Sequence, residues 1–185
     1  MTLLLIGLIL WWAAHLFKRV APAQRAALTH RFGDGSKGIV AAALLVSVVL
    51  MVIGYRSADF VPVYDPPSWG RHLNNLAMFF AIALFGLGSS KSRLRGTLRH
   101  PMLTGMAVWA VAHLLVNGDS ASLVLFGSMA VWSLVTMIVI NRAEPAPPAF
   151  TGGSAAGDLR LAIISAALYA VIAGIHGWLG YWPFP

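Results

Sequence analysis

The feature that most constrains this chain is a succession of long apolar runs, because most of them approach the length that a helix needs to cross a membrane. Inside lipid the backbone must satisfy its own hydrogen bonds, so a helix is the form that such runs adopt. The expected spans are residues 2–17, extendable to 20, then 39–55, 71–87, 101–116, 121–140 and 159–178. The sequence therefore predicts an all-α integral membrane bundle of six transmembrane helices.

The composition agrees with a membrane protein, since 58% of the residues are hydrophobic and only 10% are charged. Soluble domains carry nearer ~25% charged residues. The first residues are apolar at once, with no basic segment and no small-residue cleavage site, so we expect a retained first helix. We expect residues 1–185 to form a single transmembrane domain.

The thirteen basic residues are divided unequally between the two sides that six spans would create. Eleven follow the first, third and fifth spans: Lys18, Arg19, Arg25, Arg31, Lys37, Lys91, Arg93, Arg95, Arg99, Arg142 and Arg160. Only Arg56 and Arg71 fall on the other side. The positive-inside rule then predicts a multi-pass protein of the cell inner membrane with both termini in the periplasm. The net charge of +7 is explained by these loops, so no nucleic-acid partner is implied.

The connecting segments carry residues that interrupt helices. Gly33 and Gly35 are expected to break any helix before Gly38. Residues 56–69 contain three prolines and are expected to form a loop, whereas residues 144–158 are expected to be a mobile linker.

Other residues in the runs are expected to have structural roles. Gly105, Gly127 and Gly174 should allow close helix approach. Asn117-Gly118-Asp119 is typical of a tight turn. For Asp119 the alternative is a contact to a ligand histidine.

Histidine is the residue type with which this chain could carry chemistry, because it has six histidines and no cysteine. His15, His72, His113 and His176 lie in or at the ends of four different spans, and bundles build cofactor sites from facing helices. Neutral nitrogen donors suit haem iron or copper. The alternative for each is a buried imidazole hydrogen-bonded to a backbone carbonyl.

The predicted topology separates these histidines by depth. It places His72, His113 and His176 near the outer face, whereas His15 is offset from His113 by roughly 9 Å. His100 lies thirteen residues before His113, about 20 Å away along a helix, so the two cannot share an iron. For His100 a helix-start or headgroup contact is weighed against a role with a substrate or cofactor carboxylate, and His30 is expected to be solvated.

Several short motifs carry a family resemblance that extends over nearly the whole chain. They are Ala14-His15-Leu16, Arg99-His100-Pro101-x-x-x-Gly105, Trp109-x-x-x-His113-Leu114 and Asn117-Gly118-Asp119. The chain resembles the NnrU-like membrane proteins and the related 15-cis-zeta-carotene isomerases. The chain also contains a short internal repeat, in which Trp12-Ala13-Ala14-His15-Leu16 resembles the segment from Trp109 to Leu114.

The resemblance implies a link to denitrification and nitric oxide metabolism, and a haem b of the kind that the isomerases contain. It also implies that His15 and His113 are the haem ligands. Two positions differ from the plant enzymes: Ala110 stands in place of a cysteine and Tyr55 in place of a loop histidine. We therefore expect nitrogen-oxide metabolism or haem-dependent redox function, with cis-trans isomerisation of a carotenoid-like polyene as the alternative.

A second resemblance, through Arg99-His100-Pro101 and Gly105 alone, is to isoprenylcysteine carboxyl methyltransferases, which bind S-adenosylmethionine through that motif. The paired acidic residues of those enzymes are absent from this sequence. A membrane methyltransferase is the other alternative.

The sequence thus predicts one non-covalent haem b, held by His113 with His15 as the implied second ligand. His72 and His176 are the alternatives that topology prefers. Arg99 or Arg71 would pair the haem propionates. The expected partners are the lipid bilayer and an apolar small-molecule substrate, and the sequence identifies no protein partner.

Overall fold

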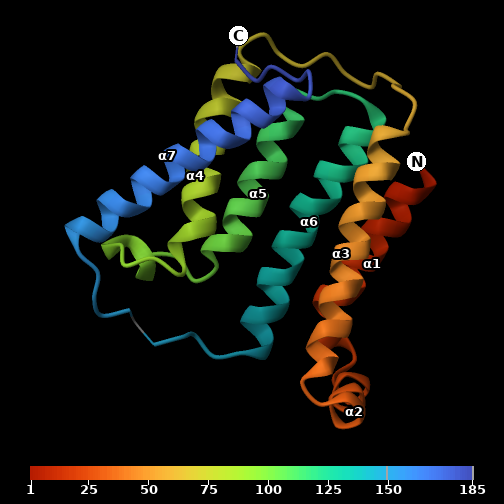
Figure 1. Cartoon of the computed structure of the whole chain (residues 1–185), viewed down its shortest axis with the longest axis vertical. Helices are drawn as coiled ribbons and strands as arrows, with labels where there is room; N and C mark the ends of the chain where they lie inside the picture. The colour runs from red at the N-terminus through yellow and green to blue at the C-terminus, as the bar shows by residue number, and fades with distance from the viewer. Residues whose placement is uncertain (149, 185) are drawn as a thin grey trace. The chain divides into compact units, whose positions relative to one another are not determined.

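The computed structural model describes residues 1–148 and 150–184, so Ala149 and Pro185 of the predicted domain and linker lie outside it. The described residues form seven α-helices and one 3-10 helix, drawn in Figure 1, with no strand beyond an isolated bridge between Pro62 and Asp119. The α-helices are α1 (Thr2–Val20), α2 (Pro22–Phe32), α3 (Gly35–Arg56), α4 (Gly70–Leu87), α5 (Pro101–Leu114), α6 (Ser120–Ala143) and α7 (Ala155–Trp178), and η1 is Arg93–Gly96. The predicted all-α class is confirmed.

Four of these helices, α1, α3, α6 and α7, are long and apolar enough to cross a membrane. Helix α5 has 14 residues and so extends about 21 Å, less than the ~30 Å of a bilayer core. Helix α4 is longer, but its first turns contain Arg71, His72, Asn74 and Asn75. The six predicted spans therefore correspond to four helices of spanning length and to a shorter pair, α4 and α5.

The polar segment after α1 contains more helix than the sequence suggested. Gly33 ends α2 with a positive φ of 54°, as expected of a helix-breaking glycine. However, α2 lies before it and α3 begins at Gly35, so helix is present before Gly38. Pro22 explains the start of α2, because a proline in the first turn presets φ and loses no helical hydrogen bond.

The chain divides into two compact units, which are described separately. Unit 1 comprises Met1–Val63 and Asp119–Ser128, and unit 2 comprises Tyr64–Gly118 and the chain from Met129 onward. Helix α6 contributes its first half to unit 1 and its second half to unit 2.

Within unit 1, α1 and α3 lie side by side along much of their length, with α2 at one end of the pair (Figure 1). Small residues permit this approach. A Cβ added at Gly54 would overlap the backbone nitrogen of Leu4, and one at Gly7 would lie 2.8 Å from the carbonyl oxygen of Ser47. Leu4 is accordingly fully buried. Close backbone contact at small residues is how membrane helices associate.

Within unit 2, α4 lies between α5 and α7 (Figure 1). A Cβ at Gly105 of α5 would lie 2.9 Å from the carbonyl oxygen of Ala81, so the close approach predicted for Gly105 is confirmed. The same prediction is wrong for Gly127 and Gly174, since an added Cβ would meet no described atom within 4 Å at either residue.

The linker that was expected to be mobile makes specific contacts where it meets α7. Asp158 accepts hydrogen bonds from Ser92 Oγ at 2.7 Å and from the backbone nitrogen of Arg93 at 2.8 Å, and it pairs with Arg93 Nε at 2.6 Å. The guanidinium of Arg95 lies over the ring of Phe150, 4.8 Å from its centroid. These contacts tie the end of the linker to the basic loop between α4 and α5.

Candidate functional site

Three of the four span histidines make the same hydrogen bond to their own helix. The Nδ1 atoms of His15, His113 and His176 lie 3.0, 2.8 and 2.8 Å from the carbonyl oxygens of the residues four positions earlier. A carbonyl oxygen can only accept, so Nδ1 carries the proton and the lone pair is on Nε2. This is the tautomer of a metal-ligating imidazole whose other nitrogen is held by a backbone carbonyl.

At two of these histidines the residue four positions earlier is a tryptophan. The rings of Trp11 and His15 have centroids 4.1 Å apart and planes at 45°, and those of Trp109 and His113 are 5.0 Å apart at 47°. Residues four apart lie on one face of a helix, which brings each indole onto the imidazole. The chain thus contains the segment Trp-x-x-x-His-Leu twice, with the same local geometry.

The internal repeat in the sequence is therefore aligned on Trp11 and not, as predicted, on Trp12. Trp12 has a different role, because its Nε1 donates to Ser128 Oγ of α6 at 3.1 Å within unit 1. The four-residue helical spacing was the signal in the sequence that could have identified Trp11.

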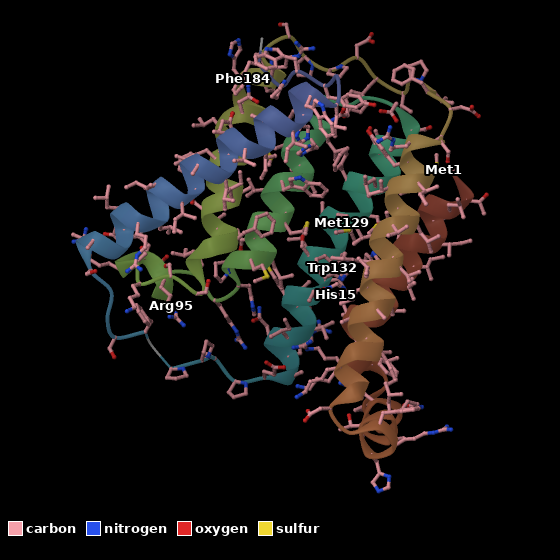
Figure 2. All side chains as sticks on the ribbon, viewed as in Figure 1. Met1, His15, Arg95, Met129, Trp132 and Phe184 are labelled. Carbon is pink, nitrogen blue, oxygen red and sulfur yellow. The ribbon has the colours of Figure 1, made fainter. Side chains whose placement is uncertain are left out.

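The histidines are distributed over both units. His15 lies in unit 1, on the part of α1 remote from Met1 (Figure 2). His72, His113 and His176 lie in unit 2. His113 and His176 are half-buried, whereas His72 is exposed at the start of α4.

The start of α4, the end of α5 and the end of α7 meet at the same end of unit 2. An added Cβ at Gly70 would overlap the carbonyl oxygen of Leu115, and Asn75 Nδ2 donates to the carbonyl oxygen of Pro183 at 3.1 Å. Figure 2 places Phe184 at this end and Arg95 at the opposite one. His72, His113 and His176 are therefore grouped at one end of unit 2, as their positions in the predicted spans suggested.

Arg99 and His100 lie at the opposite end of α5, where Arg99 binds the chain that follows α6 and His100 contacts the last turn of α6. Arg99 Nη2 donates to the carbonyl oxygens of Glu144 and Pro145 at 2.8 and 3.1 Å. His100 Nε2 lies 2.8 Å from Asn141 Oδ1, so His100 carries its proton on Nε2, opposite to the span histidines.

An open cavity lies in each unit among the described residues. In unit 2, an open pocket of about 410 Å³ lies beside the Arg-His-Pro motif, where the methyltransferase resemblance would place a ligand; its lining residues are Gly88, Ser89, Arg99, His100, Pro101, Met102 and Leu103. In unit 1, about 400 Å³ lies in a mostly apolar groove lined by Leu5, Leu8, Ile9, Trp12, Val124 and Ser128. Both volumes fall in the range of small-molecule sites.

A buried polar network in unit 1 was not anticipated. Asp119 precedes α6, where its Oδ1 accepts from the backbone nitrogen of Ser122 at 3.0 Å and its Oδ2 accepts from Ser122 Oγ. Tyr55 OH lies 2.8 Å from the same Ser122 Oγ, and its ring meets Phe126 edge-on. Asp119 therefore caps α6 in the way expected of turn chemistry. The Asp-x-x-Ser spacing was the available signal.

The donor set of the described chain fits a haem better than a metal bound by protein ligands alone. Across residues 1–148 and 150–184, no three histidine or acidic side chains are grouped to hold a metal ion. A haem needs only one or two axial side chains, because the porphyrin supplies the other ligands. Imidazoles with the lone pair on Nε2 are suitable axial donors.

The family model described as NnrU protein matches residues 3–183 of the chain. No curated protein and no solved structure matched.

Proposed function

Since this chain belongs to the NnrU family, we propose that it is an integral protein of the inner membrane that binds one non-covalent haem b and serves nitrogen-oxide metabolism or haem-dependent redox function. The observation that carries the proposal is the tautomer that three histidines of the predicted spans share. Each of His15, His113 and His176 donates Nδ1–H to its own helix and keeps the lone pair on Nε2. When bound, the haem would supply electron transfer or the binding of a small diatomic molecule at iron.

His113 is the first ligand in this proposal, because both the family resemblance and the arrangement of unit 2 select it. The resemblance implies His15 as the second ligand. Within unit 2 the favoured alternative is His176, which has the same tautomer as His113 and lies at the same end of the unit. His72 is the other alternative, and it opens α4 at the same end.

Arg71 is better suited than Arg99 to pair the propionates of a haem on His113. Arg71 lies in the first turn of α4, at the end of unit 2 that carries His113. Arg99 precedes α5 and is about 20 Å from His113 along that helix. Its guanidinium also already donates to two backbone carbonyls. By the same reasoning His100 has no role at the iron.

The membrane arrangement that we propose has six crossings, one transmembrane domain and periplasmic termini. The unequal division of the basic residues supports it, as does the apolar length of α1, α3, α6 and α7. The shorter α4 and α5 would then cross where the bilayer thins or where neighbouring helices cover their ends.

Isomerisation of a carotenoid-like polyene is the second candidate function. The apolar groove of unit 1 favours it, because a groove of about 400 Å³ between apolar side chains suits part of a long hydrocarbon. Complementation of a carotenoid pathway blocked at the 15-cis isomer would support this candidate against the redox function.

The haem proposal is tested by purifying the protein in detergent and recording its absorption spectrum and haem content. We expect a Soret band in the wild type. We expect His113→Ala to lose most of the haem, because removal of an axial ligand typically costs more than the 10–100-fold that a supporting residue costs. Single alanine variants at His15, His72 and His176 then identify the second ligand.

His30→Ala is the matched control, since His30 is exposed on α2 outside the apolar helices. It should leave the spectrum unchanged. A wild type that remains colourless when expressed with sufficient haem would refute the proposal, and an unaltered spectrum in His113→Ala would refute the assignment of that ligand.

A further inference from the structure

The open pocket of unit 2 has one polar wall and one apolar wall. Its polar lining comes from Ser89, Arg99 and His100, and its apolar lining comes from residues 101–103, which form the first turn of α5. Arg99 and Ser89 are exposed, so the pocket opens to the surroundings. A ligand that matches both walls has a polar or charged group next to an apolar part.

Arg99 brings a positive charge to this pocket that no acidic side chain of the described chain neutralises by an ion pair. Its Nη2 donates to the carbonyl oxygens of Glu144 and Pro145, which are neutral acceptors. These bonds hold the guanidinium in place and use only one of its three nitrogens. Because a guanidinium has five N–H donors, the hydrogens on Nε and Nη1 can bind the oxygens of an anion.

The start of α5 adds to the positive potential of the pocket. His100 is the N-cap residue of α5 and makes no side-chain capping bond. The backbone N–H groups of Met102 and Leu103 therefore have no partner within the helix, and the helix N-terminus carries a partial positive charge. Both residues line the pocket. Arg99 and the helix start thus favour the same sign of ligand charge.

The surroundings of the pocket are also basic. Residues 88–101 meet residues 141–148 and 150–160 at this end of unit 2, where Figure 2 labels Arg95. These segments contain two acidic side chains, one of which, Asp158, is paired with Arg93. They contain six basic side chains: Lys91, Arg93, Arg95, Arg99, Arg142 and Arg160. Basic sites on the cytoplasmic side of membrane proteins attract anionic lipids.

We propose that this pocket binds the headgroup phosphate of an anionic phospholipid. Arg99 donates to the phosphate oxygens, and the first turn of α5 contacts the glycerol and the start of the acyl chains. Inorganic phosphate has the same anionic group but offers nothing to the apolar wall, where Met102 is 63% exposed. The proposal rests on the membrane arrangement described above, which places this end at the cytoplasmic face, and it does not involve the haem.

The test is native mass spectrometry of the whole protein in a neutral detergent, titrated with dioleoyl phosphatidylglycerol at an ionic strength of ~0.15 M, where distant charges are screened. We expect one lipid to bind more tightly than those that follow. We expect Arg99→Gln to weaken that first binding by roughly 10-fold or more, because charge-assisted hydrogen bonds to the phosphate are lost. Arg142→Gln is the matched control, since it removes the same charge from the same end without changing a lining residue. It should bind nearly as the wild type does.

A second pair of variants leaves the contacts of Arg99 intact. Met102→Glu places a carboxylate in the first turn of α5, where the helix dipole favours negative charge, so the fold should be retained. The same carboxylate lies at the pocket and should repel the lipid. Met102→Gln has nearly the same size without the charge. We expect Met102→Glu to bind the lipid roughly 10-fold more weakly than Met102→Gln.

Several outcomes would overturn the proposal. Unchanged binding in Arg99→Gln and Met102→Glu would do so, as would equal weakening in Arg99→Gln and Arg142→Gln, which indicates a diffuse effect of charge. Dioleoyl phosphatidylcholine bound as tightly as phosphatidylglycerol would contradict the preference for an anionic headgroup. Displacement of the lipid by excess inorganic phosphate would identify a site for free phosphate instead. Any haem appears as a separate mass in the same spectra, so failure of the haem proposal and failure of this one are distinguishable.

Discussion

The two Trp–His pairs have the same local geometry but lie in helices that are supported differently. His15 lies inside α1, with five helical residues after it, including Lys18 and Arg19 on the following turn. His113 is the penultimate residue of α5, and its carbonyl oxygen accepts from the backbone of Val116 and Asn117. His15 therefore lies more than one turn before the end of its helix, and His113 lies in the last turn of its helix.

This difference changes the charge around each imidazole. A helix C-terminus has a partial negative charge, and His113 lies beside it. Lys18 and Arg19, three and four residues after His15, lie on the same face of α1 and bring positive charge near that histidine. The two ligand candidates therefore share the spacing of their motif but differ in the charge that lies near the imidazole.

The helix pairs that carry the two motifs also differ in how closely they pack. In unit 1 the backbones of α1 and α3 meet at Gly54, where a Cβ would overlap Leu4. In unit 2 the contact of α5 with α4 at Gly105 leaves more room, since a Cβ would lie 2.9 Å from Ala81. The support of His15 should therefore be more sensitive to an added methyl group than the support of His113.

The largest expected effect comes from breaking this contact in unit 1. Gly54→Ala should destabilise the protein by about 1–3 kcal/mol, because the new methyl group must displace the backbone of α1. Thermal unfolding in detergent measures the change. Gly127→Ala is the control, since Gly127 has open space around it and alanine has the higher helix propensity. Equal melting temperatures for the two variants would contradict the packing described for α1 and α3.

A smaller effect is expected from the equivalent change in unit 2. Gly105→Ala should lower the melting temperature by less than Gly54→Ala, because the new methyl group overlaps a backbone atom less deeply at Gly105 and the gain in helix propensity offsets part of the cost. Gly174→Ala, with no described atom near an added Cβ, is its control. A loss at Gly105 larger than at Gly54 would reverse the order of support that we infer.

The smallest effect is expected at the end of α5. Asn117 Nδ2 donates to the carbonyl oxygen of His113 at 2.8 Å, so Asn117→Ala removes one hydrogen bond, with a cost of about 1 kcal/mol. Asn75→Ala removes a similar bond to Pro183 and is the control. Both should melt at similar temperatures, but only Asn117→Ala should alter the absorption spectrum of a haem on His113. An altered spectrum in the Asn75 variant alone would argue against the distinction.

The sequence by itself determined the features that depend on neighbours along one helix. The apolar runs predicted where the helices lie, because burial in lipid and backbone hydrogen bonding favour helix wherever polar residues are rare. The histidines were found as candidate ligands for the same reason, since they are exceptional residues in such runs. For His15, His113 and His176, a hydrogen bond to a backbone carbonyl was one of the two roles foreseen.

Tertiary structure decided the features that depend on which backbone approaches which. Nothing in the amino-acid sequence distinguishes Gly105, which faces Ala81, from Gly127 and Gly174, which face open space. Asp119 was expected to serve the turn. Its hydrogen bond with Ser122 also connects it to Tyr55, which lies 67 positions before Ser122 in the chain. The grouping of His72, His113 and His176 at one end of unit 2 likewise depends on α4, α5 and α7 packing together. A contact four residues away follows from helical geometry, whereas a contact between helices follows from the fit of two surfaces, which the sequence of either helix alone does not contain.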